Sequence, residues 1–367
     1  MAKQALYRKY RPNTFEQVVG QEHITRTLAN QVKAGEISHA YLFTGSRGTG
    51  KTSTARIFAK AINCQNNQNG SPCHECEVCK SLDGLGNVDI IEIDAASNNR
   101  VDEIRQLREN VKFAPANSKY KVYIIDEVHM LTDSAFNALL KTLEEPPAHI
   151  VFILGTTEVQ KLPATIVSRC LEFDFRLVPL DTLEKLLKNI LDSENISYTE
   201  QAVKMLARSG EGSVRDMLSI ADCCCSYTND LTAESVMKVL GRSNLDVLID
   251  FAKSISKKNI GDCLAKINDV YSSGKNLVVF ARELSELYRQ LLICKTCTKP
   301  SEILSLSSED VELLISASEN FTEDELIRNL GLFSSAEMEL KYAVSPRILL
   351  ETTTLDAAIN DLVKKNE

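Results

Sequence analysis

Residues 45–52 constrain the fold of this chain more than any other segment. They read Gly-Ser-Arg-Gly-Thr-Gly-Lys-Thr and match the phosphate-binding pattern G-x-x-x-x-G-K-[ST]. The apolar run before them, residues 40–43, is typical of a buried strand, and the segment after them, residues 52–62, is typical of a helix. A strand, a glycine-rich loop and a helix in this order predict an α/β domain that binds a nucleoside triphosphate.

The residue types in this loop fit the chemistry of phosphate binding. Glycines let backbone N–H groups approach the anionic phosphates closely, at the positive end of the following helix. Lys51 is expected to reach the β- and γ-phosphates, and Thr52 to ligate Mg²⁺. The alternative is a glycine-rich turn without a ligand. The nucleotide-binding residues that the pattern predicts are Gly45, Ser46, Arg47, Gly48, Thr49, Gly50, Lys51, Thr52 and Ser53.

A second motif stands at the end of another apolar run. Residues 122–125 read Val-Tyr-Ile-Ile and lead directly into Asp126, Glu127 and, two residues later, His129. An acid at the carboxyl end of a strand lies where open α/β sheets bind ligands. We expect Asp126 to hold Mg²⁺ and Glu127 to orient the attacking water, so that the nucleotide is hydrolysed. The alternative is a strand that ends in a solvated acidic turn. His129 could sense the γ-phosphate, but we expect it to be a structural hydrogen-bonding residue.

Composition limits the classes of protein that this chain can belong to. With 367 residues, 44% of them hydrophobic and 25% charged, it is long enough for two or three domains with proper cores. It has no apolar run long enough to span a membrane and no apolar signal segment after Met1, so a cytoplasmic location without a membrane partner is expected. The net charge of −8 argues against a simple DNA-binding protein, so any DNA contact must come from a local basic surface or an assembly.

Four of the eleven cysteines form a pattern of their own, C-x8-C-x2-C-x2-C, in a segment without a hydrophobic core. Four thiolates at this spacing can surround a tetrahedral Zn²⁺, and we expect structural zinc in an insertion over residues 64–79. An iron–sulfur cluster is the main alternative. His74 could compete as a ligand. The predicted zinc ligands are Cys64, Cys73, Cys76 and Cys79.

The remaining cysteines carry less information. Residues 223–225 are three consecutive cysteines in a helix-like stretch, and we expect them to be small core residues. Cys294 and Cys297 have two-residue spacing but no second pair, so no metal is expected there.

The chain divides into three predicted domains, residues 1–178, 179–241 and 242–367. In the first, apolar strands at 41–44, 88–93, 122–126 and 150–154 alternate with helical segments, which is the signature of a parallel α/β sheet. After residue 179 the strand patterns end. The second domain is expected to be a small helical bundle and the third to be all-helical and to pack against another subunit.

Several short segments together resemble one protein family. They are residues 9–12, 18–21, the phosphate loop, the four-cysteine insertion, 94–97, 126–130, 137–141, 168–170 and 212–216. The chain resembles, over essentially its whole length, the γ/τ subunits of bacterial DNA polymerase III, the clamp-loader ATPases of the AAA+ superfamily. The resemblance implies an α/β AAA+ P-loop domain with a parallel sheet and a zinc-binding insertion, a small helical lid domain and an all-helical C-terminal collar domain.

The resemblance also implies roles for polar residues outside the two motifs. Ser213 and Asp216 suit a capping box, which would fix a helix start and aim Arg215 at the phosphates as a sensor. Either Thr156 or Thr157 would contact the γ-phosphate. Arg169 would act as an arginine finger in the site of a neighbouring subunit. From their local context alone, both arginines could equally be ordinary surface charges.

Adenine and DNA contacts are implied by resemblance alone. Adenine would be enclosed by Tyr10, Arg11, Pro12, Val18 and Val19, which offer an aromatic ring, a rigid turn and apolar walls. Duplex phosphates would be held at a helix N-terminus, for which the alternative is an Asx-rich turn. The residues of this DNA contact are Ser97, Asn98, Asn99 and Arg100.

The resulting functional expectation is an ATP-driven motor that loads a sliding clamp onto primer–template DNA. Its expected partners are δ- and δ′-type clamp-loader subunits, further copies of the chain, the clamp and the DNA. One alternative is a nucleic-acid helicase, which the Asp-Glu-x-His motif suggests but the lack of a second ATPase core opposes. The other is an inactive scaffold subunit of the clamp loader, which the intact Lys51 and Glu127 oppose.

Overall fold

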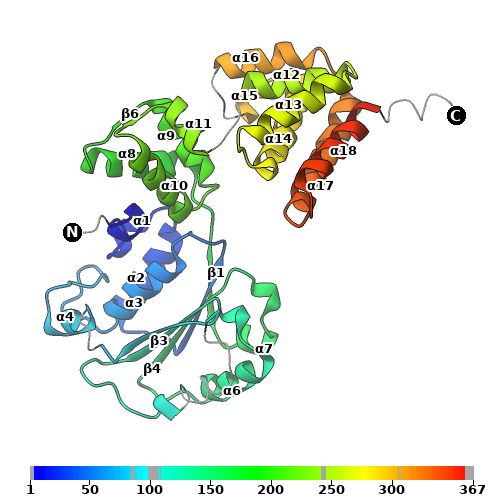
Figure 1. Cartoon of the computed structure of the whole chain (residues 1–367). Helices are drawn as coiled ribbons and strands as arrows, with labels where there is room; N and C mark the ends of the chain where they lie inside the picture. Colours follow the sequence, from blue (N-terminus) through cyan, green and yellow to red (C-terminus); the bar gives the residue numbers. More distant parts are fainter. Residues whose placement is uncertain are drawn as a thin grey trace. The chain divides into compact units, whose positions relative to one another are not determined.

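The computed structural model describes residues 4–83, 87–97, 107, 109–240, 245–304, 306 and 308–359. The chain forms two compact units, residues 1–233 and 234–367 (Figure 1). The first contains the sheet and three lid helices, and the second is helical.

A parallel sheet of five strands forms the centre of the first unit. Its order is β2-β3-β4-β1-β5, so β4 lies between β1 and β3, the two strands that lead into the sequence motifs. All four strand pairs are parallel. The predicted α/β class is therefore confirmed. The strands are β1 (Ala40–Gly45), β2 (Ile90–Asp94), β3 (Lys121–Asp126), β4 (Ile150–Gly155) and β5 (Leu171–Phe175).

Alternate residues of the central strands face two separate cores. Tyr41 and Phe43 of β1 pack with apolar side chains of α2 and α3 on one face of the sheet. Leu42 of β1 packs with α6 and α7 on the other (Figure 1). This three-layer arrangement explains why the central strands are almost continuously apolar. The helices of this part are α1 (Leu6–Lys9), α2 (Glu22–Ala34), α3 (Lys51–Ala61), α4 (Glu77–Asp83), α6 (Asp133–Glu144) and α7 (Ala164–Val167), with single turns η1 (Phe15–Gln17), η2 (Val128–Met130) and η3 (Val159–Lys161).

The lid helices complete the first unit. Their apolar faces bury Leu187, Leu206 and Leu218 against one another, and α1 packs against α10. A side-chain cap starts α10, because the Ser213 hydroxyl accepts a hydrogen bond from the Asp216 N–H (3.2 Å). This is one half of the predicted capping box; the Ser213 N–H donates to the Gly210 carbonyl (2.7 Å) and not to the Asp216 side chain. The lid elements are α8 (Leu180–Ser193), β6 (Ser197–Tyr198), α9 (Glu200–Ser209), α10 (Val214–Tyr227) and β7 (Asp230–Leu231).

The second unit packs around one long helix, α14. Tyr288 of α14 stacks on Phe333 of α17 with ring centroids 5.6 Å apart, and Phe280, Leu284, Leu287 and Leu291 form a buried apolar face of α14. The elements are α12 (Leu245–Ser256), α13 (Ile260–Ser272), α14 (Leu277–Thr296), α15 (Pro300–Ile303), α16 (Ser308–Ser318), α17 (Glu323–Leu340) and α18 (Pro346–Ile359), while α11 (Ala233–Leu240) begins at the boundary between the units.

Three details differ from the sequence-based expectations. Strand β5 was not predicted, because its exposed acids Glu172 and Asp174 interrupt the apolar pattern at a sheet edge. The short pair of β6 and β7 lies after residue 179, where no strand was expected. Cys223 is exposed, although Cys224 and Cys225 are buried as predicted, because consecutive helical residues cannot all face one core.

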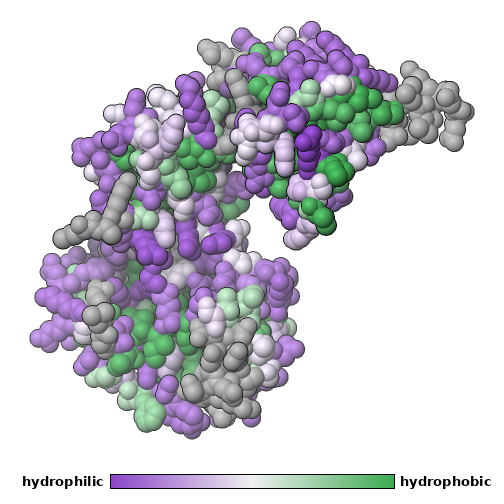
Figure 2. Space-filling model, in the orientation of Figure 1, coloured by the Kyte–Doolittle hydropathy of each residue, from purple (hydrophilic) through white to green (hydrophobic). Residues whose placement is uncertain are grey.

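The surface is mostly hydrophilic on the face drawn in Figure 2, with smaller apolar patches. Among the described residues, no helix combines the length and apolar character that a membrane span needs.

Candidate nucleotide and metal sites

The phosphate loop joins β1 to α3 in a conformation that depends on glycine. Gly45, Gly48 and Gly50 all have positive φ angles, 124°, 76° and 106°. A Cβ atom on Gly45 would lie 2.1 Å from the Phe175 carbonyl oxygen, and one on Gly48 would lie 1.9 Å from the Ser213 hydroxyl. The loop is therefore packed between the edge strand and the lid at distances that no side chain would permit.

Lys51, the first residue of α3, lies over this loop. Its side chain is buried, and its ammonium donates hydrogen bonds to the carbonyl oxygens of Gly45 (2.7 Å) and Ser46 (2.9 Å). Burial lowers the pKa of Lys51, while the carboxylates of Glu127 and Asp126 oppose that shift. An ammonium held this way can move a short distance onto an anionic phosphate that enters the loop.

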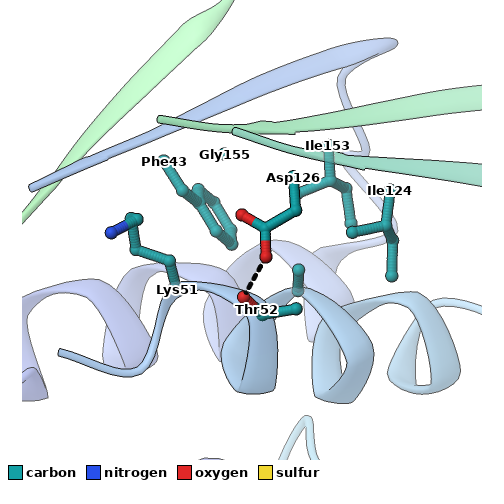
Figure 3. Close-up of a pocket in the computed structure, with 8 residues that line it drawn as sticks. Phe43, Lys51, Thr52, Ile124, Asp126, Ile153 and Gly155 are labelled. Atoms are coloured by element: carbon teal, nitrogen blue, oxygen red, sulfur yellow. Dashed lines mark hydrogen bonds between the residues drawn. The ribbon is translucent and has the colours of Figure 1, made fainter. Parts of the chain in front are cut away.

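Asp126 lies at the end of β3, and its carboxylate reaches the start of α3 past the end of the neighbouring strand β4. The Thr52 hydroxyl donates a 2.7 Å hydrogen bond to Asp126 Oδ2, and Figure 3 shows the two side chains facing each other above the helix. Gly155, at the end of β4, makes this possible, since a Cβ atom there would lie 2.9 Å from Asp126 Oδ1. A carboxylate and a hydroxyl this close are oxygen donors of the kind that Mg²⁺ prefers, so the pair fits that ion.

Glu127 has a strained backbone conformation, and its carboxylate is hydrogen-bonded to a hydroxyl group. Its φ angle is 49°, a left-handed value that is uncommon outside glycine, and its N–H donates to Asp126 Oδ1 (3.0 Å). Its carboxylate oxygen Oε2 accepts a hydrogen bond from the Thr157 hydroxyl (3.1 Å). Such strained positions are frequent at functional sites, and this one turns the carboxylate out of the sheet.

The two neighbouring threonines have different surroundings. Thr156 is fully buried, and its hydroxyl contacts His129 Nδ1 (3.0 Å) and accepts from the Glu158 N–H (3.0 Å). Thr157 instead contacts the carboxylate of Glu127. His129 therefore hydrogen-bonds to Thr156, and its Nδ1 also lies 3.5 Å from Glu127 Oε2, while Thr157 contacts that carboxylate directly.

The lid lies next to the phosphate loop through the start of α10. Arg215 follows the capping Ser213, and its guanidinium carbon lies 5.4 Å from the centre of the Tyr7 ring, a cation–π contact. Tyr7 was not singled out from the sequence, because no local signal pairs it with a residue more than 200 positions away. The contact fixes Arg215 on the N-terminal segment.

The N-terminal segment borders the loop from another side. Val18 is buried and would lie 3.7 Å from a Cβ atom on Gly50. The side-chain amide of Gln21, a residue given no role from the sequence, donates to the Arg176 carbonyl (2.6 Å) and accepts from its N–H (3.2 Å). Val19 is half-buried.

The other residues expected around adenine have partners in the lid or are half-buried. The Tyr10 hydroxyl donates to Glu194 Oε1 (2.5 Å), and Lys9 pairs with the same oxygen. Arg11 and Pro12 are half-buried, and burial lowers the pKa of Arg11. The segment thus joins the sheet and the lid around the loop.

The expected finger residue, Arg169, and one of the expected DNA residues, Ser97, have hydrogen-bond partners within the chain. Arg169 pairs with Glu144 Oε1 (2.9 Å) and donates to the Thr165 carbonyl (2.8 Å). The Ser97 hydroxyl donates to Asp94 Oδ2 (3.1 Å) in a turn after β2. Asn98, Asn99 and Arg100 lie outside the described residues.

The four cysteines of the insertion meet in one cluster. The Sγ atoms of Cys64, Cys73, Cys76 and Cys79 all lie within 4.8 Å of one another. Three backbone N–H groups point at them, from Cys73 to the Cys64 sulfur (3.3 Å), from Cys76 to the Cys73 sulfur (3.4 Å) and from Cys79 to the Cys76 sulfur (3.4 Å). His74 instead contacts the Asn13 carbonyl (3.0 Å).

The surroundings shift the pKa values of the four thiols in opposite directions. Burial opposes ionisation of Cys76, but the N–H groups of Cys79 and Gln65 bring its pKa down to about 6. The N–H of Glu75 lowers the pKa of Cys73, whereas burial raises the pKa of Cys64 and Cys79. Four sulfur donors in this arrangement fit a tetrahedral metal ion.

Three family models cover most of the chain. Residues 20–179 match the model described as DNA polymerase III, delta subunit. Residues 182–230 match the ATPase lid domain of the DNA polymerase III clamp loader subunit. Residues 231–367 match domain III of DNA polymerase III subunits gamma and tau.

Curated relatives extend these matches. DNA polymerase III subunit tau of Bacillus subtilis is 43% identical over 97% of this chain and 63% of its own length. Subunit tau of Escherichia coli is 45% identical over 75% of this chain, which spans only 43% of that protein. Subunit gamma of Buchnera aphidicola is 38% identical over 79% of both chains. The chain therefore belongs to the γ/τ family of DNA polymerase III subunits.

Proposed function

We propose that the chain is an ATP-hydrolysing motor subunit of a bacterial clamp loader and acts in the cytoplasm. The observation that carries the proposal is the convergence of Lys51, Thr52, Asp126 and Glu127 on the phosphate loop of a chain in this family. ATP binding would order several subunits around the sliding clamp and primer–template DNA, and hydrolysis would release both.

Each residue at the loop has a separate task in this proposal. Lys51 leaves the loop carbonyls to neutralise the β- and γ-phosphates, and Thr52 with Asp126 holds Mg²⁺. Mg²⁺ held by these residues would supply positive charge that offsets the charge of the phosphates. Glu127 accepts a proton from the attacking water, and Thr157 holds its carboxylate in place until the nucleotide enters.

Arginines from two sources would complete the site. Arg215 lies beside the phosphate loop of its own chain and would sense the γ-phosphate. Arg169, which pairs with Glu144 within its own chain, would serve the site of a neighbouring copy, as the family resemblance of its segment implies. We further propose Zn²⁺ in the four-cysteine cluster, an adenine contact by residues 10–12 and 18–19, and a DNA contact by residues 97–100.

The experiment that tests the motor compares two stimuli. The chain, assembled with δ- and δ′-type partner subunits, is assayed for ATP hydrolysis with primed DNA, with the clamp and with both. We expect the largest rate when primed DNA and clamp are present together. A rate that rises instead with strand separation of a duplex, whether or not the clamp is present, would identify a helicase, and no hydrolysis under any condition would identify a scaffold subunit.

A mixing experiment tests whether sites are shared between copies. Arg169→Ala chains keep a sound nucleotide site, and Lys51→Ala chains keep a sound finger. Each variant alone should be slow. Arg169→Ala lacks the finger, which contributes roughly 10³–10⁵ in rate in other phosphoryl-transfer enzymes, and Lys51→Ala lacks a working nucleotide site. Part of the activity should return on mixing, as a function of protein concentration. No recovery in mixtures shown to co-assemble would remove Arg169 from the proposed mechanism.

A further inference from the structure

The four-cysteine insertion contains a tight hairpin that projects a serine. Gln68 and Ser71 exchange backbone hydrogen bonds of 2.9 and 2.8 Å. The two residues between them, Asn69 and Gly70, have positive φ angles of 52° and 90°, as a type I′ turn requires. Ser71 is 3% exposed, so the hairpin buries it against another part of the first unit.

The buried serine binds the N-terminal segment. Its hydroxyl oxygen accepts a hydrogen bond from the Phe15 N–H (3.1 Å) and donates one to Glu16 Oε2 (2.9 Å). A second contact joins His74 to the Asn13 carbonyl (3.0 Å). The insertion therefore satisfies backbone groups of residues 13–19, which we name the strap.

The hairpin itself rests on a rigid helix. A Cβ atom on Gly70 would lie 2.5 Å from the Ala29 carbonyl oxygen of α2, so the turn packs directly on the helix backbone. With one side on α2 and the other on the strap, Ser71 has little freedom to move while the hairpin is intact.

The strap passes from this serine to the phosphate loop. Phe15 anchors it in the core that α2 and α3 share with the sheet. Three residues later, Val18 lies against Gly50 of the phosphate loop, at 3.7 Å from a Cβ position there. A displacement of Phe15 would therefore also displace Val18, which lies three residues later against the phosphate loop.

We propose that the four-cysteine insertion positions the nucleotide site, with Ser71 as the positioning residue that fixes the strap. The proposal rests on the assignment of the strap and its neighbours to the adenine end of the site. Metal binding matters here because Cys64 and Cys73 flank the hairpin and Ser71 lies two residues before Cys73. With the metal bound, the hairpin is closed and the strap is held. Without it, the hairpin opens and the strap loosens.

The first test replaces the hydroxyl. Ser71→Ala leaves a buried N–H of Phe15 without an acceptor, so the dissociation constant for a fluorescent ribose-labelled ATP should rise about three- to tenfold. The KM for ATP should rise by a similar factor while kcat stays unchanged, because no group at the phosphates is altered. Ser81→Ala is the matched control, since that hydroxyl bonds to the Val78 carbonyl within α4. Equal affinities for Ser71→Ala and Ser81→Ala would overturn the proposal.

The second test removes the metal from the unaltered chain. After chelation, with zinc loss checked by elemental analysis, deuterium uptake by residues 13–19 should increase and nucleotide affinity should fall, and both should recover when zinc is restored. If the strap stays protected and the affinity stays constant after zinc loss, the proposal fails. This arm keeps the proposal testable if Ser71→Ala does not fold.

A reference variant separates this proposal from the proposed function. Lys51→Ala should abolish binding of the labelled ATP whether or not the insertion acts on the strap. If the wild-type chain binds no better than Lys51→Ala, the nucleotide assignment itself is wrong. If it binds far better, and the Ser71 and metal arms show no change, only the role of the insertion is wrong.

Discussion

The two ends of helix α3 carry segments that are stabilised in opposite ways. At its N-terminus, the phosphate loop is packed between β5, the lid and the strap, with Gly45 against the Phe175 carbonyl. Beyond its C-terminus, Cys64 begins an insertion whose centre is a cluster of four sulfur atoms. The loop depends on glycines, which have no side chain, and the insertion depends on the side chains of four cysteines.

This difference determines how each segment fails. An atom added to a closely packed loop displaces the strands around it, because protein interiors have few voids that could accept the atom. Loss of a ligand cluster loosens the segment that it holds and whatever that segment contacts, which here is the strap. The predictions below test this contrast, beginning with the largest expected effect.

The chemistry at the loop should be lost without any change in the insertion. Glu127→Gln should bind ATP nearly normally but hydrolyse it about 10²–10⁴-fold more slowly, since general bases contribute that much. Lys51→Ala should instead weaken binding, because it removes a charge-assisted contact. Equilibrium binding and steady-state hydrolysis distinguish the two, with metal content as the control. Equal loss of binding in both variants would remove Glu127 from its assigned role.

Adding one methyl group to the loop should destabilise the whole sheet domain. Gly45→Ala must adopt a φ angle of 124° and place a Cβ atom 2.1 Å from a backbone oxygen. We expect a loss of more than about 3 kcal/mol in the free energy of unfolding, measured by chemical denaturation.

A second glycine provides the matched control for that variant. Gly35→Ala also requires a positive φ angle, 72°, but its Cβ atom would meet nothing within 4 Å. It should cost only about 1 kcal/mol, the conformational cost alone. If the two alanine variants lose the same stability, then close packing is not what holds the loop.

Loss of one sulfur ligand should have a smaller and local effect. Cys76→Ser should reduce bound zinc from about one ion per chain to none, because four ligands are needed to close a structural site. Deuterium uptake should rise over residues 64–79 and over the strap, but not in β1 or β3. Cys223→Ser, a change at an exposed cysteine of the lid, should retain the metal. If the purified chain contains iron and absorbs visible light, the four cysteines hold an iron–sulfur cluster and not zinc.

The same contrast explains what the sequence could and could not predict. The phosphate loop, Asp126 and the four cysteines were found because their chemistry requires fixed residue types at short spacings. Gly155 and Gln21 act only through strands and loops that are distant in the chain, so no local pattern reveals them. Strand β5 was missed because an edge strand with exposed acids lacks the apolar run that revealed β1, β3 and β4.

The smallest effect is expected where the lid meets the loop. Ser213 caps α10 and also lies against Gly48. Ser213→Ala should cost about 1 kcal/mol of lid stability, the usual value for a lost cap, measured by thermal denaturation. It should also weaken ATP binding severalfold, because a frayed first turn no longer aims Arg215 at the loop.

A second cap in the same lid separates these two effects. The Thr199 hydroxyl caps α9 by accepting from the Ala202 N–H at 3.3 Å, and α9 provides none of the residues found at the loop. Thr199→Ala should therefore cost a similar amount of lid stability and leave ATP affinity unchanged. If both variants weaken ATP binding equally, the lid acts on the nucleotide through its stability alone. The close contact of Ser213 with Gly48 would then have no functional role, and the loop would depend only on its own strands and on the strap.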